Sequence, residues 1–320
     1  TRQPEVGAAI EATIGRTYFG LGLYDQARPH LDSAYAIRRR TLGRSDLSFA
    51  ESARDVGTLA SAAGDFALAE QRLTEGLAIK RAKLQPDDDR ITDNLALLAD
   101  VRYSRGDNAG SERLHREALR LSRARHGNTG VQVALRLRSV ATILTYTGRS
   151  EEAEPLFEES LRMLRQAYGD NHPEIVGALV SLGEAKQQHR DFPGAEATFR
   201  EALPIANTVY GQEHPSIANV VSRLGGVLTD QRRLQEAEPL LRDAIAMRVK
   251  LLGEQHLDVQ LARVNLGRLL VEQRKYDEAD TVITKALVVR RAALGDSSPA
   301  VASTIEDLAR VANERGDWAV

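Results

Sequence analysis

The sequence predicts an all-α solenoid of stacked antiparallel helix pairs, with seven complete pairs and one additional C-terminal helix. Three observations lead to this prediction: glycine recurs in loops at a fixed interval, a large residue followed by a tiny one recurs in a first helix, and small residues line a second helix. The interval is 42 residues, as between Gly211 and Gly253. A fixed period of this size is typical of repeat proteins, in which each unit packs against its neighbours.

The loops between successive units carry glycine at all but one of the positions that the 42-residue interval marks; we call this series of positions the register. A chain that leaves a helix often needs a left-handed residue, and glycine adopts that conformation without steric cost. In some units a proline then marks the start of the next helix, where its missing N–H would be unpaired in any case. The loop positions are Gly43, Gln85, Gly127, Gly169, Gly211, Gly253 and Gly295.

The first helix of each unit carries a bulky residue followed by a glycine or an alanine. We expect the bulky residue to fill the core and the small one to let a neighbouring helix approach closely. The pairs are Ile14-Gly15, Val56-Gly57, Leu98-Ala99, Val140-Ala141, Leu182-Gly183, Leu224-Gly225, Leu266-Gly267 and Leu308-Ala309.

The turn inside each unit has glycine in most repeats but arginine in three. If this turn is left-handed, an arginine there costs on the order of 1 kcal/mol more than a glycine. Either the turn differs in those repeats or they absorb the strain. The turn positions are Gly22, Gly64, Gly106, Gly148, Arg190, Arg232, Arg274 and Gly316.

The second helix presents a stripe that runs small, large, small. In most units alanine begins the stripe, a large apolar residue follows four positions later, and a small residue completes it, as in Ala195, Phe199 and Ala202. The third unit departs from this pattern, because Ser111 and His115 stand at the first two positions. We therefore expect the third unit to be the softest part of the solenoid.

The pattern resembles the tetratricopeptide repeat, whose signature is W-x2-L-G-x2-Y…A-x3-F. Here it reads Leu179-x2-Leu182-Gly183-x2-Lys186…Ala195-x3-Phe199. The period exceeds the usual 34 residues of the family by about two helical turns and, with the recurring loops, resembles the kinesin-light-chain subtype. The resemblance implies one right-handed superhelix over residues 1–320, with the first helices on its concave side.

The composition and the absence of known motifs argue against an active site within this chain. The 43 basic and 45 acidic residues nearly balance, which gives no broad footprint for nucleic acid. The sequence has no cysteine, no long apolar run for a membrane span and no recognisable nucleotide-binding or hydrolase motif. We therefore expect a cytoplasmic protein that is not an enzyme, has no cofactor or metal, and binds neither nucleic acid nor membrane.

Three histidines recur on the register, at His172, His214 and His256. A metal site would require them to converge on one ion, at about 2.0–2.1 Å from each ligand atom. Packed helices lie ~8–10 Å apart, so equivalent residues of successive pairs are too distant to share an ion. We interpret these histidines as capping residues of the loops.

The expected functional surface is the concave face, where arginine, tyrosine and small polar residues gather. Such side chains suit bidentate contacts to carboxylates and hydrogen bonds to the backbone of an extended peptide. A dedicated clamp for a C-terminal carboxylate is not expected, because most residue types differ from that pattern. The predicted groove residues are Arg54, Thr58, Asp93, Asp100, Tyr103, Arg138, Thr142, Tyr146, Ser181, Gln187, Asn219, Arg223, Asn265 and Arg268.

The predicted function is a scaffold that binds a peptide segment or a partner domain. The alternative is a regulatory or self-associating arm of a larger bacterial signalling enzyme, such as a serine/threonine kinase or a nucleotide-dependent switch. The start at Thr1 suggests a fragment of a longer protein, and an eighth second helix is expected to begin near Trp318. The apolar face of the last helix then offers a place for self-association.

Overall fold

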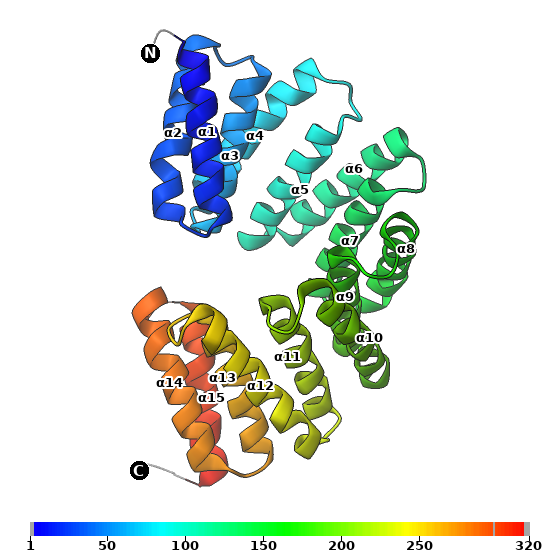
Figure 1. Cartoon of the computed structure of the whole chain (residues 1–320), viewed down its shortest axis with the longest axis vertical. Coiled ribbons are helices and arrows are strands. Elements are labelled where there is room, and N and C mark those ends of the chain that lie inside the picture. Colours follow the sequence, from blue (N-terminus) through cyan, green and yellow to red (C-terminus); the bar gives the residue numbers. More distant parts are fainter. Residues whose placement is uncertain (1–2, 297, 317–320) are drawn as a thin grey trace. The chain divides into compact units, whose positions relative to one another are not determined.

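The computed structural model describes residues 3–296 and 298–316, and these ranges form fifteen α-helices arranged as seven antiparallel pairs and one last helix (Figure 1). The fold class predicted from the sequence is confirmed. The predicted start of another helix near Trp318 lies outside the described residues. The first helices are α1 (Pro4–Gly20), α3 (Leu47–Ala62), α5 (Asp89–Ser104), α7 (Val131–Tyr146), α9 (Pro173–Gln188), α11 (Pro215–Asp230), α13 (Leu257–Glu272) and α15 (Pro299–Arg315). The second helices are α2 (Tyr24–Thr41), α4 (Phe66–Lys83), α6 (Asn108–His126), α8 (Ser150–Tyr168), α10 (Phe192–Tyr210), α12 (Leu234–Leu252) and α14 (Tyr276–Leu294).

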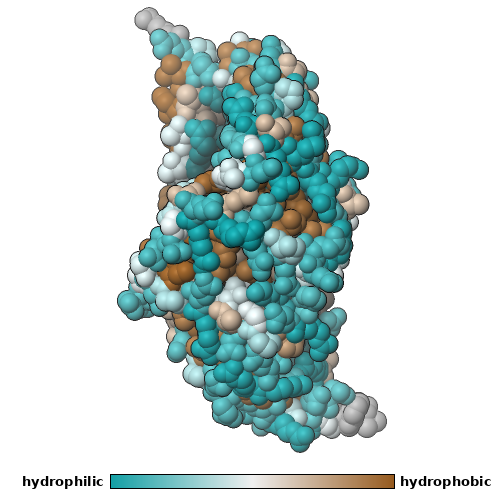
Figure 2. Space-filling view, turned by 90° about the vertical axis from the view of Figure 1, so that its right-hand side faces the viewer, coloured by the Kyte–Doolittle hydropathy of each residue, from teal (hydrophilic) through white to brown (hydrophobic). Residues whose placement is uncertain are grey.

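The chain divides into two compact units, Thr1–Met163 and Leu164–Val320. We call them the N-terminal and C-terminal units and describe each by itself. The expectation of a single domain over residues 1–320 stays a prediction. No helix in the described ranges is long and apolar enough to cross a membrane. The face shown in Figure 2 is mainly hydrophilic, with apolar residues in scattered patches.

The turn inside each unit is left-handed whether glycine or arginine occupies it. Gly64 has φ of 80°, while Arg190, Arg232 and Arg274 have φ of 65°, 63° and 62°. The sequence left two possibilities open, and the structure selects the second, in which the arginines carry the strain of a left-handed backbone. The predicted left-handed loop glycines are also confirmed, for example at Gly211 with φ of 88°.

The small residue of the first helix makes room for the large residue of the second helix. A Cβ atom placed on Gly225 would lie 2.8 Å from both Cγ and Cδ2 of Leu241, and one on Gly183 would lie 2.5 Å from the ring of Phe199. Carbon atoms prefer separations of about 3.5–4.0 Å, so a methyl group does not fit at either position. The predicted role of the small residue, close approach between paired helices, is confirmed.

The second helices of several repeats bury a cation against the first helix of the next repeat. In α2, Arg38 donates from Nη1 to Oγ of Ser52 at 3.0 Å, and in α14, Arg290 donates from Nη1 to Oγ1 of Thr304 at 2.7 Å. All four side chains are buried. A hydrogen bond to a charged group contributes more than a neutral one, so these pairs stabilise the contact between repeats.

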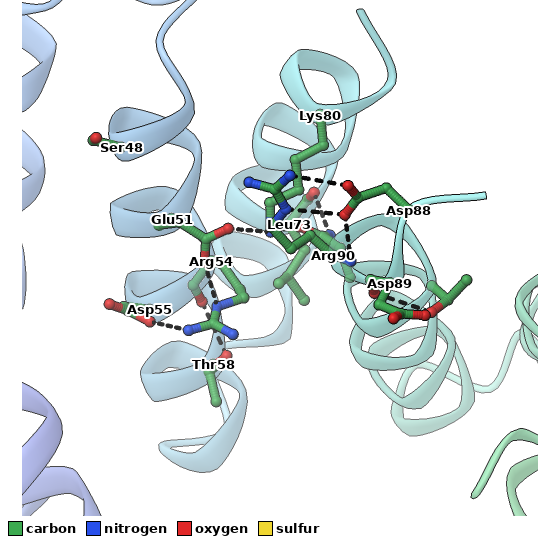
Figure 3. Close-up of polar contacts among 12 residues, drawn as sticks. Ser48, Glu51, Arg54, Asp55, Thr58, Leu73, Lys80, Asp88, Asp89 and Arg90 are labelled. Carbon is green, nitrogen blue, oxygen red and sulfur yellow. Dashed lines mark hydrogen bonds and ion pairs between the residues drawn. The ribbon is translucent and has the colours of Figure 1, made fainter. Parts of the chain in front are cut away.

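Two further buried cations, Lys80 and Arg248, stand at the repeat position that Arg38 and Arg290 hold, but their surroundings differ. Lys80 lies 3.0 Å from Oε1 of Glu51 and 3.3 Å from Oδ1 of Asn94, as Figure 3 shows for the pair with Glu51. In the repeat of Arg248, Ala262 stands at the sequence position that is equivalent to Ser52 and Thr304. Nη1 of Arg248 has no hydrogen-bond partner among the described residues. Burial lowers the pKa of both Lys80 and Arg248.

Candidate peptide-binding groove

Successive first helices contact one another within each unit, whereas successive second helices do not. In the N-terminal unit α3 contacts α1 and α5, and in the C-terminal unit α13 contacts α11 and α15. No such contact joins α4 to α6 or α12 to α14 in the described parts of the chain. The first helices therefore lie on the inner side of the stack, and their exposed faces form the candidate groove.

Four of the predicted groove residues come together in the C-terminal unit. Gln187, Arg223, Asn265 and Arg268 come from α9, α11 and α13, and they line one hollow of about 310 Å³. The hollow extends to Arg310 of α15, so side chains from four successive first helices share it. The sequence analysis did not select Arg310, although it stands 42 residues after Arg268, and the register itself was the signal for it.

Each arginine of this hollow is paired with an acid of a neighbouring repeat. Arg223 lies 2.8 Å from Oε1 of Glu184, and Arg310 lies 2.6 Å from Oε1 of Glu272. Arg268 donates both Nε and Nη2 to the carboxylate of Asp307, at 2.8 Å each. Burial raises the pKa of Glu184, and the charge of Arg223 opposes that rise.

Gln187 extends the same arrangement without a charge. Its Nε2 donates to Oδ2 of Asp230 at 2.6 Å. The hollow therefore presents polar side chains from successive first helices, and carboxylates of the chain already balance its guanidinium charges. The bidentate carboxylate contact expected of a ligand is, at Arg268, made by the chain itself.

The N-terminal unit has a second hollow, of about 300 Å³, near its first repeats. Arg54 and Thr58 of α3 line it together with Arg16 and Asp55. Arg54 lies between Glu51 and Asp55, at 3.2 Å and 3.0 Å, and Figure 3 shows both contacts. Arg16 also reaches Asp55, at 3.0 Å. The pattern of the C-terminal unit recurs here, because groove arginines are held by acids of the chain.

A third hollow, of about 210 Å³, lies between α5, α6 and α7 in the N-terminal unit. It contains five predicted groove residues, Asp100, Tyr103, Arg138, Thr142 and Tyr146. The rings of Tyr103 and Tyr146 stack with centroids 5.3 Å apart. Two residues that the sequence analysis had noted only as departures from the core pattern, Ser111 and His115, also line it. We call this hollow the repeat-three pocket.

The remaining predicted groove residues line none of these three hollows. Asp93 accepts a hydrogen bond from Nη2 of Arg136 at 2.6 Å. Ser181 donates to the backbone oxygen of Gly177, within its own helix. Asn219 is half-buried in α11. The structure thus gives Asp93 and Ser181 partners within the chain.

The recurring histidines cap helices, as interpreted from the sequence. Nδ1 of His172, His214 and His256 accepts a hydrogen bond from the backbone N–H two residues later, at 3.1–3.2 Å. His172 and His214 also stack on Tyr168 and Tyr210, with centroids 3.9 Å and 4.2 Å apart. Within residues 3–296 and 298–316, no group of three histidine or acidic side chains is arranged to hold a metal ion.

The repeat geometry agrees with a comparison against known families. The family model described as tetratricopeptide repeat matches residues 8–82, 91–166, 135–208 and 216–287. The chain belongs to the tetratricopeptide repeat family. No curated protein sequence matches this tetratricopeptide repeat protein.

Solved structures share the fold of this tetratricopeptide repeat protein at low sequence identity. BtubC (BKLC) from P. vanneervenii is 21% identical with a TM-score of 0.57, and the match covers 78% of this chain and 92% of that chain. A putative kinesin light chain of Podospora anserina is 17% identical with a TM-score of 0.56, covering 66% and 100%. The apo form of RapI is 14% identical with a TM-score of 0.68, covering 89% and 97%.

Proposed function

We propose that this tetratricopeptide repeat array binds a peptide segment or a partner domain along the faces of its first helices. The observation that carries the proposal is the hollow of the C-terminal unit, to which four successive first helices contribute polar side chains. A structural neighbour, a Rap protein, was solved in complex with Competence and Sporulation Factor, at 13% identity and a TM-score of 0.57. That neighbour supports a ligand-binding role for this fold.

The charges of the groove favour an extended, mixed-polarity peptide. Because Glu184, Asp307 and Glu272 balance the groove arginines, a strongly acidic ligand would have to displace carboxylates that are already in place. A peptide backbone offers donors and acceptors in alternation and can bind without breaking these pairs. Micromolar affinity, ~8 kcal/mol, is expected for such a site.

The test is capture of partners from a proteome by the parent chain and by two double variants. Arg138→Ala/Arg223→Ala removes one groove arginine from each unit. The matched control, Arg81→Ala/Arg242→Ala, removes the same charge from second helices, where Arg81 pairs with Glu117 and Arg242 with Glu278. A partner lost only by the groove variant supports the proposal. Equal capture by all three proteins contradicts it.

Absence of enzymatic activity and a cytoplasmic location remain predictions, as does a place in a larger signalling enzyme. Self-association is a second candidate, because Ile305 of α15 is 42% exposed whereas the equivalent Leu179 and Val221 are buried. Sedimentation of the parent and of Ile305→Glu tests it. Self-association predicts a concentration-dependent dimer that the variant loses.

A further inference from the structure

Gly226 is a glycine in the interior of α11 that the packing of the chain does not require. A Cβ atom placed there would meet only Nε2 of Gln187, at 3.9 Å, which is ordinary van der Waals contact. Its backbone is helical and not left-handed. Gly225, by contrast, is needed, because a Cβ atom there would lie 2.8 Å from Leu241. A glycine inside a helix lowers stability relative to alanine, so the reason for Gly226 lies outside the fold.

Position 226 differs from all its register equivalents. The other seven first helices carry arginine, threonine, aspartate or glutamate there, as at Thr142, Glu184 and Arg268. Gly226 has no side chain, and it lines the hollow of about 310 Å³ in the C-terminal unit. The glycine therefore leaves space inside the hollow to which four successive first helices contribute.

Two arginines beside Gly226 define what fits in that space. Arg223 lies one turn earlier on α11, and Arg268 stands at the equivalent position on α13. Both side chains line the hollow and are 45% exposed, whereas their acids, Glu184 and Asp307, do not line it and are 20% and 11% exposed. A ligand that enters the hollow therefore meets these arginines before their acids. A guanidinium group has five N–H donors and Asp307 engages two of those of Arg268, so donors remain for a ligand.

Two acids do line the hollow, and partners within the chain already engage both of them. Asp230 accepts a hydrogen bond from Nε2 of Gln187 at 2.6 Å. Glu272 pairs with Arg310 at 2.6 Å and also with Arg232. A cationic ligand group would have to compete with Gln187, Arg232 and Arg310 for these acids. An oxygen acceptor avoids that competition, because it uses donors of the arginines beside Gly226.

We propose that the space at Gly226 receives one long side chain of a bound peptide, and that this side chain ends in an oxygen acceptor, as in glutamate or glutamine. Its stem passes over Gly226, where no side chain obstructs it, and its oxygen accepts from Arg223 or Arg268. Gly226 is then a residue that determines which peptides bind. This inference rests on the proposed function, because it names one residue of the peptide that lies in the groove.

The test uses peptides selected on the parent chain from a phage-displayed library of random dodecapeptides. Fluorescence anisotropy gives their affinities for the parent, Gly226→Gln and Gly226→Ala. Gly226→Gln fills the space with an uncharged side chain that favours a helix. Gly226→Ala is the matched control, because its added methyl group fits there without filling the space. Circular dichroism and melting confirm that each variant is folded.

The expected result is enrichment of glutamate or glutamine at one peptide position. Binding to Gly226→Gln should be about tenfold weaker than to the parent, whereas binding to Gly226→Ala should change by less than about threefold. Replacing the enriched residue by leucine should weaken binding to the parent but not to Gly226→Gln, since that variant has already lost the contact. Each peptide is measured in its glutamate and glutamine forms, which distinguishes a carboxylate from an amide.

Three outcomes would contradict the inference. Equal binding to the parent and to Gly226→Gln, or an equal loss for Gly226→Ala and Gly226→Gln, overturns the role of the space at Gly226 and leaves groove binding intact. A lysine, an arginine or an apolar residue at the peptide position that Gly226→Gln affects overturns the oxygen acceptor. Failure to select any peptide on the parent overturns both the inference and the peptide-binding function.

Discussion

The close approach of helices in each pair predicts opposite effects for two adjacent glycines in α11. Gly225 and Gly226 lie next to each other in the same helix, and an alanine at either would raise helix propensity by about 1 kcal/mol. They differ in what the new methyl group meets. At Gly225 it would lie 2.8 Å from Leu241, whereas at Gly226 the nearest atom is Nε2 of Gln187, at 3.9 Å.

The magnitude follows from the distance. Leu241 is buried, and both Cγ and Cδ2 would have to withdraw by roughly 0.7 Å to reach ordinary contact. Overpacking of this kind costs about 1–3 kcal/mol, which exceeds the gain in propensity. We therefore expect Gly225→Ala to lose about 1 kcal/mol of stability and Gly226→Ala to gain about 1 kcal/mol.

The assay is native-state hydrogen exchange of amides in α11 and α12, combined with the melting temperature, because repeat arrays need not unfold in two states. A third background, Leu241→Ala, removes the obstructing side chain. There Gly225→Ala should become neutral or stabilising, and the difference between backgrounds measures the clash. If Gly225→Ala stabilises the parent as much as Gly226→Ala does, the packing argument is wrong.

Three other predictions concern strain, a buried cation and pH. Arg190→Gly should raise stability by about 0.5–1 kcal/mol by relieving a left-handed backbone, whereas Arg190→Ala should not, and equal melting temperatures for the two variants would contradict this. Ala262→Ser should raise the melting temperature by supplying Arg248 with the hydroxyl that equivalent repeats provide, and no increase would count against that interpretation. Hydrogen bonds, first from Lys275, lower the pKa of Glu238 from 4.5 to about 2, so its contribution to stability is present above about pH 4.5 and is lost as the pH falls toward 2. Glu238→Gln should therefore flatten the loss of stability across that range in acid titrations followed by circular dichroism, and an unchanged profile would refute the assignment.

The fold could be predicted from the sequence because its signals are local and repeated. A helical period, a loop glycine such as Gly211 and a small residue such as Gly225 each reflect what the backbone close to them in sequence needs. The same signals then recur at the 42-residue interval in every unit. The capping role of His214 was also accessible, since it stands directly before a helix that begins with Pro215.

Only the general location of the candidate site could be predicted from the sequence. The register identified which residues face the groove, and most of them do line the three hollows. It did not reveal that Arg268 is held by Asp307 or that Arg223 is held by Glu184, because each pair joins different repeats and depends on the directions of long side chains.

The sequence by itself determined the repeat, the helix pairs and the residues at their turns, since backbone conformation and helical periodicity depend on neighbours along the chain. Only the tertiary structure decided that the turn at Arg232 is strained, that the groove charges are balanced, and that Ser111 and His115 meet Asp100 at one pocket. These outcomes depend on distances between side chains of different helices. Such distances are fixed when the helices pack, and no pattern along the chain states them.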